Sequence, residues 1–417
     1  MNEALQTFLT SYTKYSTFIP KPEPLNLQNA TNRILAQDYK STIDIPPFNK
    51  SAMDGYAVIA ANTKNTSQKH PLSLEVVGTA NAGDTNSYKI NSGQTVAIAT
   101  GAKIPPGADA VVMIEDTDGD KKSVKIFKET KNGKNVIIKG EDIKTGQLLL
   151  TKGTWLKPQD IGLMASVGIS SIKVFCKPKV AVFSTGNELV EPGDTLTTNA
   201  VLYDSNRYML TGMINECGGE AIDLGICKDD QTSIQNTLKK ALQYDLIIIS
   251  GGSSVGEKDY VPNVINHIGK PGIIIHGIAM RPGSPTALGI VDGKPIISTP
   301  GYPVAAFFAF YTFGRPLIFS MIGTPELPKT YITAKMSSGI KLRKDMRAFV
   351  RVKICPTTNS KGLLCYMAEP VSATAASLLS TLSSSDGVII VDGKSRLVKG
   401  QRVEVLLLNA RSSCPVV

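Results

Sequence analysis

The feature that most constrains the fold is a regular alternation of apolar and amphipathic segments between residues 178 and 325. Short apolar segments, typical of buried strands, are "PKVAVFST", "EAIDLGIC", "DLIIIS" and "KPIISTP". Between them, apolar residues have helical spacing in "NRYMLTGMINECGG", "TSIQNTLKKALQY" and "YVPNVINHIG". Strands that alternate with helices form a mostly parallel sheet with helices on both faces, so we predict an α/β domain here.

The regions on either side of this domain have a different pattern. Residues 45–140 hold short β-like runs separated by Gly, Asn and Asp, which predict a small all-β unit. Beyond residue 330, five further runs predict a C-terminal barrel or sandwich. Near the N-terminus, "EALQTFLTSY" has helical spacing, and "NLQNATNRILAQDYKS" predicts a short helix capped near Asn29. At roughly 150 residues per domain, the 417 residues suggest about three domains.

Composition narrows the classes of partner. The net charge of +10 would suit nucleic acid, but the lysines are scattered and only 6% of residues are aromatic. The aromatic-basic interleaving of single-strand binders is missing, so a small anionic ligand is favoured over nucleic acid. The cysteines show no C-x-x-C spacing, so neither a zinc site nor a disulfide framework is indicated. We expect reduced thiols in a cytosolic protein at Cys176, Cys217, Cys227, Cys355, Cys365 and Cys414.

One stretch resembles a membrane span, "VAAFFAFYTFGRPLIFSMI" at residues 304–322. Gly314, Arg315 and Pro316 interrupt it, and the apolar pieces on either side are too short to cross a bilayer. The N-terminal residues lack the apolar segment and cleavage site of a signal peptide. We therefore predict a buried helix, and a cytoplasmic protein with no membrane contact.

Candidate chemistry follows the predicted strands of the α/β domain. Ligands of open parallel sheets bind at the carboxyl ends of the strands. Glycines, small hydroxyls and carboxylates follow all of them, in "GNE" (186–188), "DD" (229–230), "GGSSVGEKD" (251–259) and "GYP" (301–303). Gly251 and Gly252 allow close backbone approach, and a helix that begins near Tyr260 would offer free N–H groups to a phosphate. The glycine pair alone is also explained by a tight strand-to-helix turn.

The carboxylates Glu188, Asp229 and Asp259 end at the same predicted edge. Like charges gathered together are costly without a cation, and Mg²⁺ takes carboxylates together with phosphate oxygens. Singly, each acid has a plainer explanation, and Asp229 could cap the helix that begins near residue 232. Asp54-Gly55 and "GED" (140–142) are, by themselves, turn signals. Arg281 by itself is a surface cation.

Eight stretches in this order resemble the molybdopterin molybdenumtransferase family (MoeA, and the E domain of gephyrin) over nearly the whole chain. They are "PPFNKSAMDGYAV", "TGAKIPPGADAVVMIED", "GEDIKTGQLL", "FSTGNELVEPGD", "YDSNRYML", "SGGSSVGEKDYV", "RPGSPTALG" and "TPGYPVAAF". The resemblance implies an elongated dimer of four-domain chains. It implies domain I at 27–45 and 141–177, an inserted β domain II at 46–140, a three-layer α/β domain III at 178–326 and a β-barrel domain IV at 327–417. Residues 1–26 would pack with domain III, which resembles the molybdopterin adenylyltransferase of the preceding step.

The resemblance also implies a reaction. An enzyme of this family takes adenylylated molybdopterin and molybdate, inserts the metal into the dithiolene and hydrolyses the adenylate with the help of Mg²⁺, releasing AMP. The implied catalytic acids are Asp54, Asp142, Glu188, Asp229 and Asp259, of which the first two come from the partner subunit of a homodimer. The implied Mg²⁺ ligands are Glu188, Asp229 and Asp259. The implied pterin-binding residues are Thr185, Gly186, Ser205, Asn206, Ser250, Gly251, Gly252, Gly256, Pro300 and Gly301.

Departures from the family pattern fall on the residues that would handle the oxyanion. Arg281 and Ser284 replace two lysines, and serine removes the charge that arginine keeps. Arg347 and Arg351 remain as implied oxyanion contacts of domain IV. Asn49-Lys50 and Tyr302 also differ from the usual residues. These changes leave the choice of oxyanion open, including a copy that handles tungstate or is otherwise specialised.

Two other functions stay open at this point. One is the preceding step, adenylylation of molybdopterin by residues 178–325, although a lone α/β unit suffices for that reaction. The other is a scaffold that binds a partner peptide, as the E domain of gephyrin also does. The resemblance to the molybdenumtransferase family also suggests a contact with the molybdopterin adenylyltransferase of the preceding step.

Overall fold

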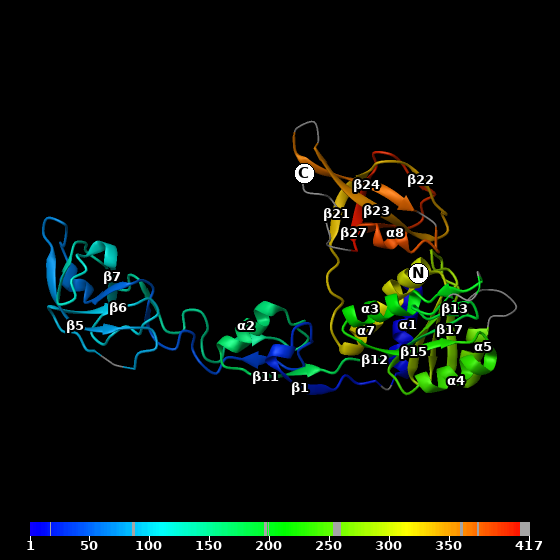
Figure 1. Cartoon of the computed structure of the whole chain (residues 1–417), viewed down its shortest axis with the longest axis horizontal. Coiled ribbons are helices and arrows are strands. Elements are labelled where there is room, and N and C mark those ends of the chain that lie inside the picture. Colours follow the sequence, from blue (N-terminus) through cyan, green and yellow to red (C-terminus); the bar gives the residue numbers. More distant parts are fainter. Residues whose placement is uncertain are drawn as a thin grey trace. The chain divides into compact units, whose positions relative to one another are not determined.

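The computed structural model describes residues 1–16, 18–85, 88–195, 198, 200–252, 260–358, 362–372 and 375–408 (Figure 1). These residues form two compact units. One unit is Pro24–Val174, and the other joins Met1–Glu23 to Phe175–Val417. The finer division into domains I to IV stays a prediction.

The larger unit contains the predicted α/β domain. Its six-stranded sheet has the order β15-β12-β16-β20-β19-β17. The first four strands are mutually parallel, and β19 and β17 complete the sheet in antiparallel fashion. The mostly parallel sheet is thus confirmed. The strands are β15 (Glu220–Cys227), β12 (Lys179–Thr185), β16 (Leu246–Ser250), β20 (Lys294–Thr299), β19 (Ala287–Val291) and β17 (Pro271–His276).

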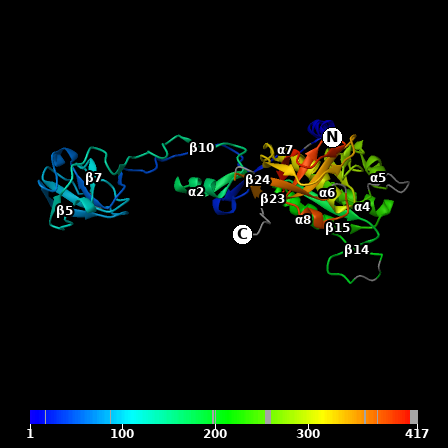
Figure 2. The ribbon, with the colours of Figure 1, turned by 90° about the horizontal axis from the view of Figure 1, so that it is seen from above.

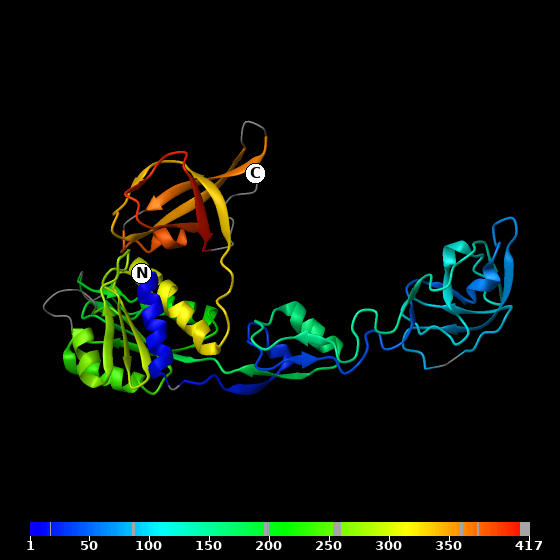
Figure 3. The same cartoon turned by 180° about the vertical axis from the view of Figure 1, so that it is seen from behind.

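Helices cover both faces of this sheet, which makes the three layers (Figure 3). On one face, α4 (Gln231–Ala241) and α5 (Tyr260–Ile268) pack on Phe183, Ile247 and Ile249. On the other face, Ile214 of α3 (Asn206–Glu216) lies near Val180. Val180 and Phe183 are three residues apart on β12, so their side chains point to opposite faces of the sheet. Helix α3 also packs against α6 (Pro303–Ala309) and α7 (Arg315–Ile322), while α1 (Asn2–Tyr15) contacts β17 and β19.

The apolar stretch predicted as a buried helix is α6 and α7, joined by a π-helical turn, η4 (Phe310–Gly314). Pro303–Ile322 has the length and hydropathy of a membrane span, but 72% of its most apolar window is buried inside the protein. Its apolarity is therefore accounted for by packing against α3 and β20.

The C-terminal part of the larger unit is a closed five-stranded barrel, since β23, β24, β21, β27 and β25 pair in sequence and β25 pairs back to β23. The sequence left barrel or sandwich open, and this ring of pairings decides it. Val350, Val352 and Val405 are fully buried in its core. The elements are β21 (Tyr331–Met336), β22 (Ile340–Lys341), β23 (Arg347–Thr358), β24 (Leu364–Ser372), α8 (Ser380–Ser383), β25 (Gly387–Val391), β26 (Arg396–Leu397) and β27 (Arg402–Leu407).

The barrel is joined to the α/β domain by backbone and ring contacts. The short strand β18 (Met280–Arg281) runs parallel to β23, with Met280 opposite Arg347. The rings of Phe308 and Phe349 stack with their centroids 4.4 Å apart. Phe349 thus faces the α/β domain, and Arg347 and Arg351 share its side of β23 because side chains alternate along a strand.

The smaller unit contains the predicted all-β region, a five-stranded sheet of order β7-β4-β6-β5-β8 (Figures 1 and 2). Its strands are β4 (Gly55–Val58), β5 (Leu72–Ala80), β6 (Gln94–Ile98), β7 (Ala110–Met113) and β8 (Ser123–Ile126). The remaining elements of this part of the chain are β1 (Pro22–Asn26), β2 (Tyr39–Lys40), β3 (Lys50–Ser51), η2 (Ala60–Thr63), η3 (Ile114–Asp116), β9 (Val136–Ile137), β10 (Leu148–Leu150), α2 (Pro158–Ser166) and β11 (Ser171–Phe175).

The prediction of a short helix in "NLQNATNRILAQDYKS" is wrong except for a single helical turn. Only η1 (Leu27–Asn29) forms, and its cap is Asn26, whose side chain accepts from the Gln28 amide. Further along, Ile34 forms a bridge with Trp155, and Leu35 forms one with Val174. These long-range pairings take the backbone groups that a longer helix would need.

Candidate active site at the carboxyl ends of the parallel strands

The four parallel strands end side by side. Thr185 of β12 is opposite Cys227 of β15, and Ser184 is opposite Ser250 of β16. Ser250 is in turn opposite Thr299 of β20. The loops that follow these strands therefore begin at one edge of the sheet, which brings Gly186, Asp229, Gly251 and Gly301 to a common rim.

Asn206, at the start of α3, ties two of these strand ends together. Its Nδ2 donates to Ser250 Oγ at 2.8 Å and to the Gly301 carbonyl at 2.7 Å. The residue is 6% exposed, and its Oδ1 has no hydrogen-bond partner among the residues that the structure describes. A buried acceptor without a partner is costly, so this oxygen would favour a ligand or water that brings a donor. Ser205 precedes it as the N-cap residue, and its side chain makes no capping bond.

The beginning of the glycine loop is packed too tightly for side chains. Gly251 has φ +97°, and a Cβ there would lie 2.3 Å from the Thr185 carbonyl oxygen. Gly252 has φ +60°, and a Cβ there would lie 2.5 Å from Val261 Cγ2. Backbone thus lines this part of the rim, next to the buried Pro300. Gly256 and Asp259, predicted for the same loop, lie outside the described residues.

Two of the predicted acids flank the turn after β12. The Glu188 carboxylate lies beside Gly186, where a Cβ would come within 2.8 Å of Glu188 Oε1. Asp229 Oδ1 accepts from Thr185 Oγ1 at 3.2 Å, and the Asp229 amide donates to Asn187 Oδ1 at 3.2 Å. Both carboxylates are therefore held against the end of the same strand.

The N-cap of α4 is Asp230 and not Asp229. The Asp230 carboxylate accepts from the Ser233 amide at 2.8 Å and from Ser233 Oγ at 2.7 Å. These hydrogen bonds hold the pKa of Asp230 below its usual value. Asp229 is consequently not needed as the N-cap of α4 and remains available at the rim.

The rim fits a magnesium ion that shares its ligands with a substrate. Glu188 is exposed and Asp229 is half-buried, so both offer oxygens to solvent. Within the described ranges, no three His, Cys, Asp or Glu side chains gather closely enough to hold a metal by themselves. Mg²⁺ usually takes one or two carboxylates and completes its shell with phosphate oxygens and water. Glu188 and Asp229 would supply the carboxylates, and a phosphate-bearing substrate would have to supply the other oxygens.

An ion cluster around the buried Arg207, behind the rim, was not anticipated from the sequence. Arg207 is 3% exposed and pairs with the carboxylates of Asp204, Asp223 and Glu191. Burial alone would lower the pKa of Arg207, but the hydrogen bonds that its guanidinium donates to the three carboxylates outweigh burial and raise the pKa. The signal that could have revealed part of it is Asp204 in "DSNR", since an acid just before a helix commonly accepts hydrogen bonds from the first backbone amides of that helix.

This cluster orients the rim residues on either side of it. Asp204 accepts from the backbone amides of Asn206 and Arg207 at 3.1 and 3.2 Å, which aligns the start of α3. On the other side, β13 (Leu189–Val190) pairs with β14 (Leu202–Tyr203), and the Glu188 carbonyl accepts from the Leu202 amide at 2.7 Å (Figure 2). The loop that carries Glu188 is thereby connected to α3.

The four residues predicted to handle an oxyanion come from two neighbouring strands and the turn after β18. Arg281 on β18 is exposed and lies opposite Ala348 of β23. Ser284 is half-buried, and its carbonyl accepts from the Ile278 amide at 2.8 Å. Arg347 is occupied, since it pairs with Asp392 and donates to Asn2 Oδ1 at 3.0 Å.

Arg351 is the unusual member of this group. Its side chain is fully buried, and its one hydrogen bond among the described residues runs from Nη2 to the Ala375 carbonyl at 2.9 Å. Its Nε and Nη1 have no partner in that part of the chain. The neighbouring Ala376 carbonyl accepts from the Val304 amide at the start of α6, at 3.0 Å, so Arg351 lies close to the helix that follows Gly301.

The two remaining acids, Asp54 and Asp142, belong to the smaller unit and are both exposed. Asp54 Oδ1 accepts from the Thr100 amide at 2.7 Å. Gly55, next to it, is required because a Cβ there would lie 1.9 Å from the Val112 carbonyl oxygen. Asp54 thus lies in the bend that precedes β4, in line with the predicted turn, and Gly55 begins the strand that packs against β7.

Comparison with known families accounts for nearly the whole chain. Residues 1–168 match the family described as the MoeA N-terminal region (domain I and II). Residues 181–320 match a probable molybdopterin binding domain, and residues 333–408 match the MoeA C-terminal region (domain IV).

Individual relatives are similar over most of their own length. A molybdopterin molybdenumtransferase of Staphylococcus aureus is 32% identical over 91% of this chain and 90% of its own. The enzyme of the same name from Haemophilus influenzae is 38% identical over 75% of this chain and 76% of its own. A solved structure of the molybdopterin biosynthesis MoeA protein from Pyrococcus horikoshii has a TM-score of 0.80 and 34% identity, and it covers 98% of this chain and 99% of its own.

Proposed function

The chain belongs to the MoeA family of molybdenum cofactor biosynthesis, and from this premise we propose that it inserts molybdenum from molybdate into adenylylated molybdopterin and releases AMP. The observation that carries the proposal is the common rim of four strand ends. It combines a backbone-lined glycine turn with two carboxylates and with an asparagine that has a free buried acceptor.

We propose that the rim binds the pterin substrate through its backbone. Gly251 and Gly252, at the start of the Ser250–Gly256 loop, and Gly186 in the turn after Thr185 would let backbone approach the terminal phosphate closely, because these three positions carry no side chain. Asn206 Oδ1 would accept a hydrogen bond from the substrate, and Ser205, Pro300 and Gly301 would border it. Such fixed contacts lower the barrier by positioning the reacting groups.

The acids would act on the adenylate. Glu188, Asp229 and Asp259 would hold Mg²⁺, which supplies charge neutralisation at the pyrophosphate. Asp229, held by Thr185, would orient water for attack on the adenylate, so that AMP leaves with the oxygen of that water. Asp54 and Asp142 would complete the site from the partner subunit of a homodimer.

Molybdate is a substrate here, and we propose that it enters beside β18 and β23. Arg351 would bind it, since two of its buried N–H-bearing nitrogens lack partners. Arg281 and Ser284 would border the same entry, whereas the contacts of Arg347 with Asp392 and Asn2 favour a structural role for that residue. Electrostatic stabilisation of this kind acts most strongly where water is excluded.

A matched pair of adjacent acids tests the assignment. We expect Asp229→Asn to lower AMP release from adenylylated molybdopterin at least about a hundredfold, as for the loss of a general base. Asp230→Asn should keep most of the activity, because Asp230 caps α4 and does not line the rim. AMP release and cofactor formation are measured with molybdate and Mg²⁺ present. Equal activity of the two variants would refute the role of Asp229, and ATP turnover without adenylylated substrate would favour the preceding step instead.

The choice of oxyanion is a finer proposal. Serine at 284, in place of a charged residue, weakens the electrostatic attraction of the site for any tetrahedral dianion. The choice between molybdate and tungstate would then depend on Arg281 and Arg351. We propose that this combination shifts preference toward tungstate. AMP release is followed against rising molybdate and tungstate in competition, and a tighter apparent affinity for molybdate would rule the shift out.

A further inference from the structure

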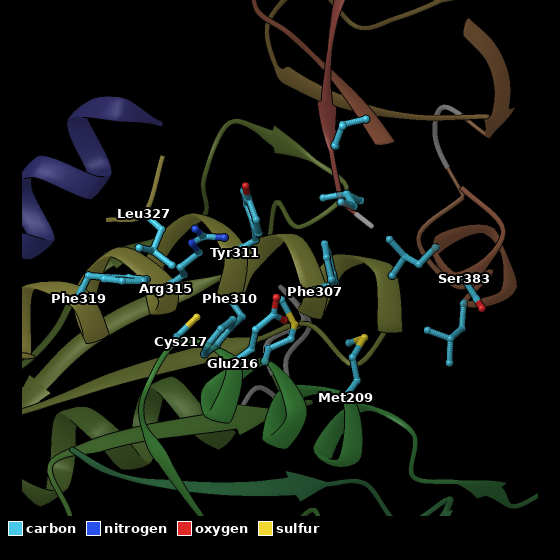
Figure 4. A pocket seen from close by; sticks show the side chains of 15 residues that line it. Met209, Glu216, Cys217, Phe307, Phe310, Tyr311, Arg315, Phe319, Leu327 and Ser383 are labelled. Carbon is cyan, nitrogen blue, oxygen red and sulfur yellow. The ribbon is translucent and has the colours of Figure 1, made fainter. Parts of the chain in front are cut away.

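A hollow in the larger unit contains none of the rim residues. Its cavity volume is about 360 Å³. One wall comes from α3, a second from α6, η4 and α7, and a third from α8 and the end of β27 in the barrel (Figure 4). Cavities of about 300 to 1,000 Å³ that lie between domains are the usual location of small-molecule sites.

The walls of the hollow are mainly apolar and partly uncovered. Phe307 and Tyr311 stack with their ring centroids 6.1 Å apart, and both side chains are only half-buried. Met209, Leu379 and Leu408 face them from the other walls and are also half-buried. Apolar side chains that stay uncovered inside a fold lose favourable contacts, and a ligand with an apolar body would restore them.

A π-helical turn shapes this wall. Residues Phe310–Gly314 form η4, and Phe310 and Tyr311 both line the hollow. Gly314 is needed there, because a Cβ would lie 2.5 Å from Phe310 Cδ2. Single π-helical turns inside α-helices occur frequently at functional sites.

The charged groups at the hollow have incomplete partners. Arg315 Nε lies 2.8 Å from Glu326 Oε1, yet both atoms are buried and their alignment makes no hydrogen bond within the described chain. Lys329 Nζ is 3.2 Å from the same Glu326 oxygen. Arg315 and Lys329 thus share the Glu326 carboxylate, but Lys329 does not line the hollow. Arg315 is the one cation among the described residues that line it.

The remaining polar groups set limits on the ligand. Burial raises the pKa of Tyr311 to about 12, so its hydroxyl stays a hydrogen-bond donor at neutral pH. Burial likewise raises the pKa of Cys217 to about 12, which leaves an unreactive thiol and favours reversible binding. Glu216 also lines the hollow, with its carboxylate turned toward the space beside Phe307, and it would repel a second negative charge (Figure 4).

We propose that this hollow binds a small amphipathic monocarboxylate. Its apolar body would lie among Phe307, Tyr311 and the leucines of the barrel, and its carboxylate would pair with Arg315. A guanidinium is suited to this because it presents several N–H groups to a carboxylate in one plane. The ligand would touch both the α/β domain and the barrel and would stabilise their association. The proposal does not depend on molybdenum transfer.

Three probes with the same apolar body test the charge preference: phenylbutyrate, phenylbutanol and phenylbutylamine. Binding to the full chain is measured by calorimetry. Phenylbutyrate should bind about tenfold more tightly than phenylbutanol, as expected for one charge-assisted hydrogen-bonded pair, and phenylbutylamine should bind most weakly. Equal affinities, or tightest binding of the amine, would overturn the proposal. Probe binding that disappears as the chain self-associates would also overturn it, in favour of a second copy as the occupant.

Variants locate the binding. Arg315→Met removes the cation but keeps an apolar chain of similar length, and it should reduce phenylbutyrate to the affinity of phenylbutanol. Lys329→Met removes a charge from the same cluster but does not line the hollow, so the preference should survive. Met209→Trp narrows the hollow from α3 and should weaken all three probes, which decides the matter if Arg315→Met does not fold. A preference retained in Arg315→Met, or unchanged binding to Met209→Trp, would contradict the assignment.

Discussion

At the scale of single residues, Arg351 combines a destabilising buried charge with a proposed role in binding molybdate. It is fully buried on the side of β23 that faces the α/β domain, and no carboxylate in the described chain pairs with it. Burial lowers its pKa to about 10, so it is still charged at neutral pH. The folded pKa lies below the ordinary value of arginine, so the cost is fully present below about pH 10 and fades as the pH rises above it.

We therefore predict opposite effects of Arg351→Met on stability and on function. Removing an unpaired buried charge should raise the melting temperature, whereas loss of the proposed oxyanion contact should raise the apparent KM for molybdate. Lys353→Met, which removes an exposed cation from the same strand, should change neither quantity. Thermal unfolding and AMP release are measured on the same preparations. A lower melting temperature together with an unchanged KM would show that Arg351 is structural.

At the scale of elements, the start of α3 connects the fold to the rim. Arg207 pairs with Asp204, Asp223 and Glu191, and Asp204 in turn aligns the helix whose first residue is Asn206. Asp204 is 1% exposed, so its charge depends on Arg207 for a partner. One ion cluster thus connects α3, which carries Asn206, to the β13–β14 pair next to Glu188.

We predict that Arg207→Met destabilises the larger unit by about 3 to 5 kcal/mol, because it leaves the buried Asp204 carboxylate without a cation. Tyr208→Phe removes an exposed hydrogen bond to the same Glu191 and should cost less than about 1 kcal/mol. Urea unfolding followed by circular dichroism gives both values. Similar midpoints for the two variants would mean that the cluster contributes little.

At the scale of the whole molecule, the predicted acids fall into two compact units. Glu188 and Asp229 belong to the unit with the α/β domain, and Asp54 and Asp142 belong to the other. Under the proposed function, a complete site takes one unit from each subunit of a homodimer. Symmetric dimers commonly share sites in this way, since each interface residue then occurs twice.

Mixing inactive subunits tests this sharing. Homodimers of Asp54→Ala and of Asp229→Asn should each be inactive. In a mixed dimer, one of the two sites is intact, so random exchange should restore about a quarter of the wild-type AMP release. Mixing Asp229→Asn with Glu188→Gln should restore nothing, because both changes lie in the same unit. No recovery in the first mixture, with exchange verified, would exclude a shared site.

Much of the fold was readable from the sequence because its signals are local. The apolar periodicity of "KVAVFST", "LIIIS" and "TSIQNTLKKA" determined strands and helices that the structure has at nearly the same bounds. The alternation of these elements determined the mostly parallel sheet, and with it the edge where glycines and acids follow each strand. The resemblance of eight ordered stretches determined the family, which the comparisons confirm.

Tertiary structure decided what depends on partners far away in the chain. Asp229 and Asp230 are equivalent as sequence, and only the contacts with Thr185 and Ser233 separate a rim carboxylate from a helix cap. The pairing of β25 with β23 made the C-terminal strands a barrel, and bridges from Ile34 and Leu35 replaced a predicted helix. The pairing of β18 with β23 brought Arg281 opposite Ala348, and folding left Arg351 buried without an acid among the described residues. Local patterns determine which elements form, but burial and pairing arise only when distant segments meet, and these two properties give each charged residue its role.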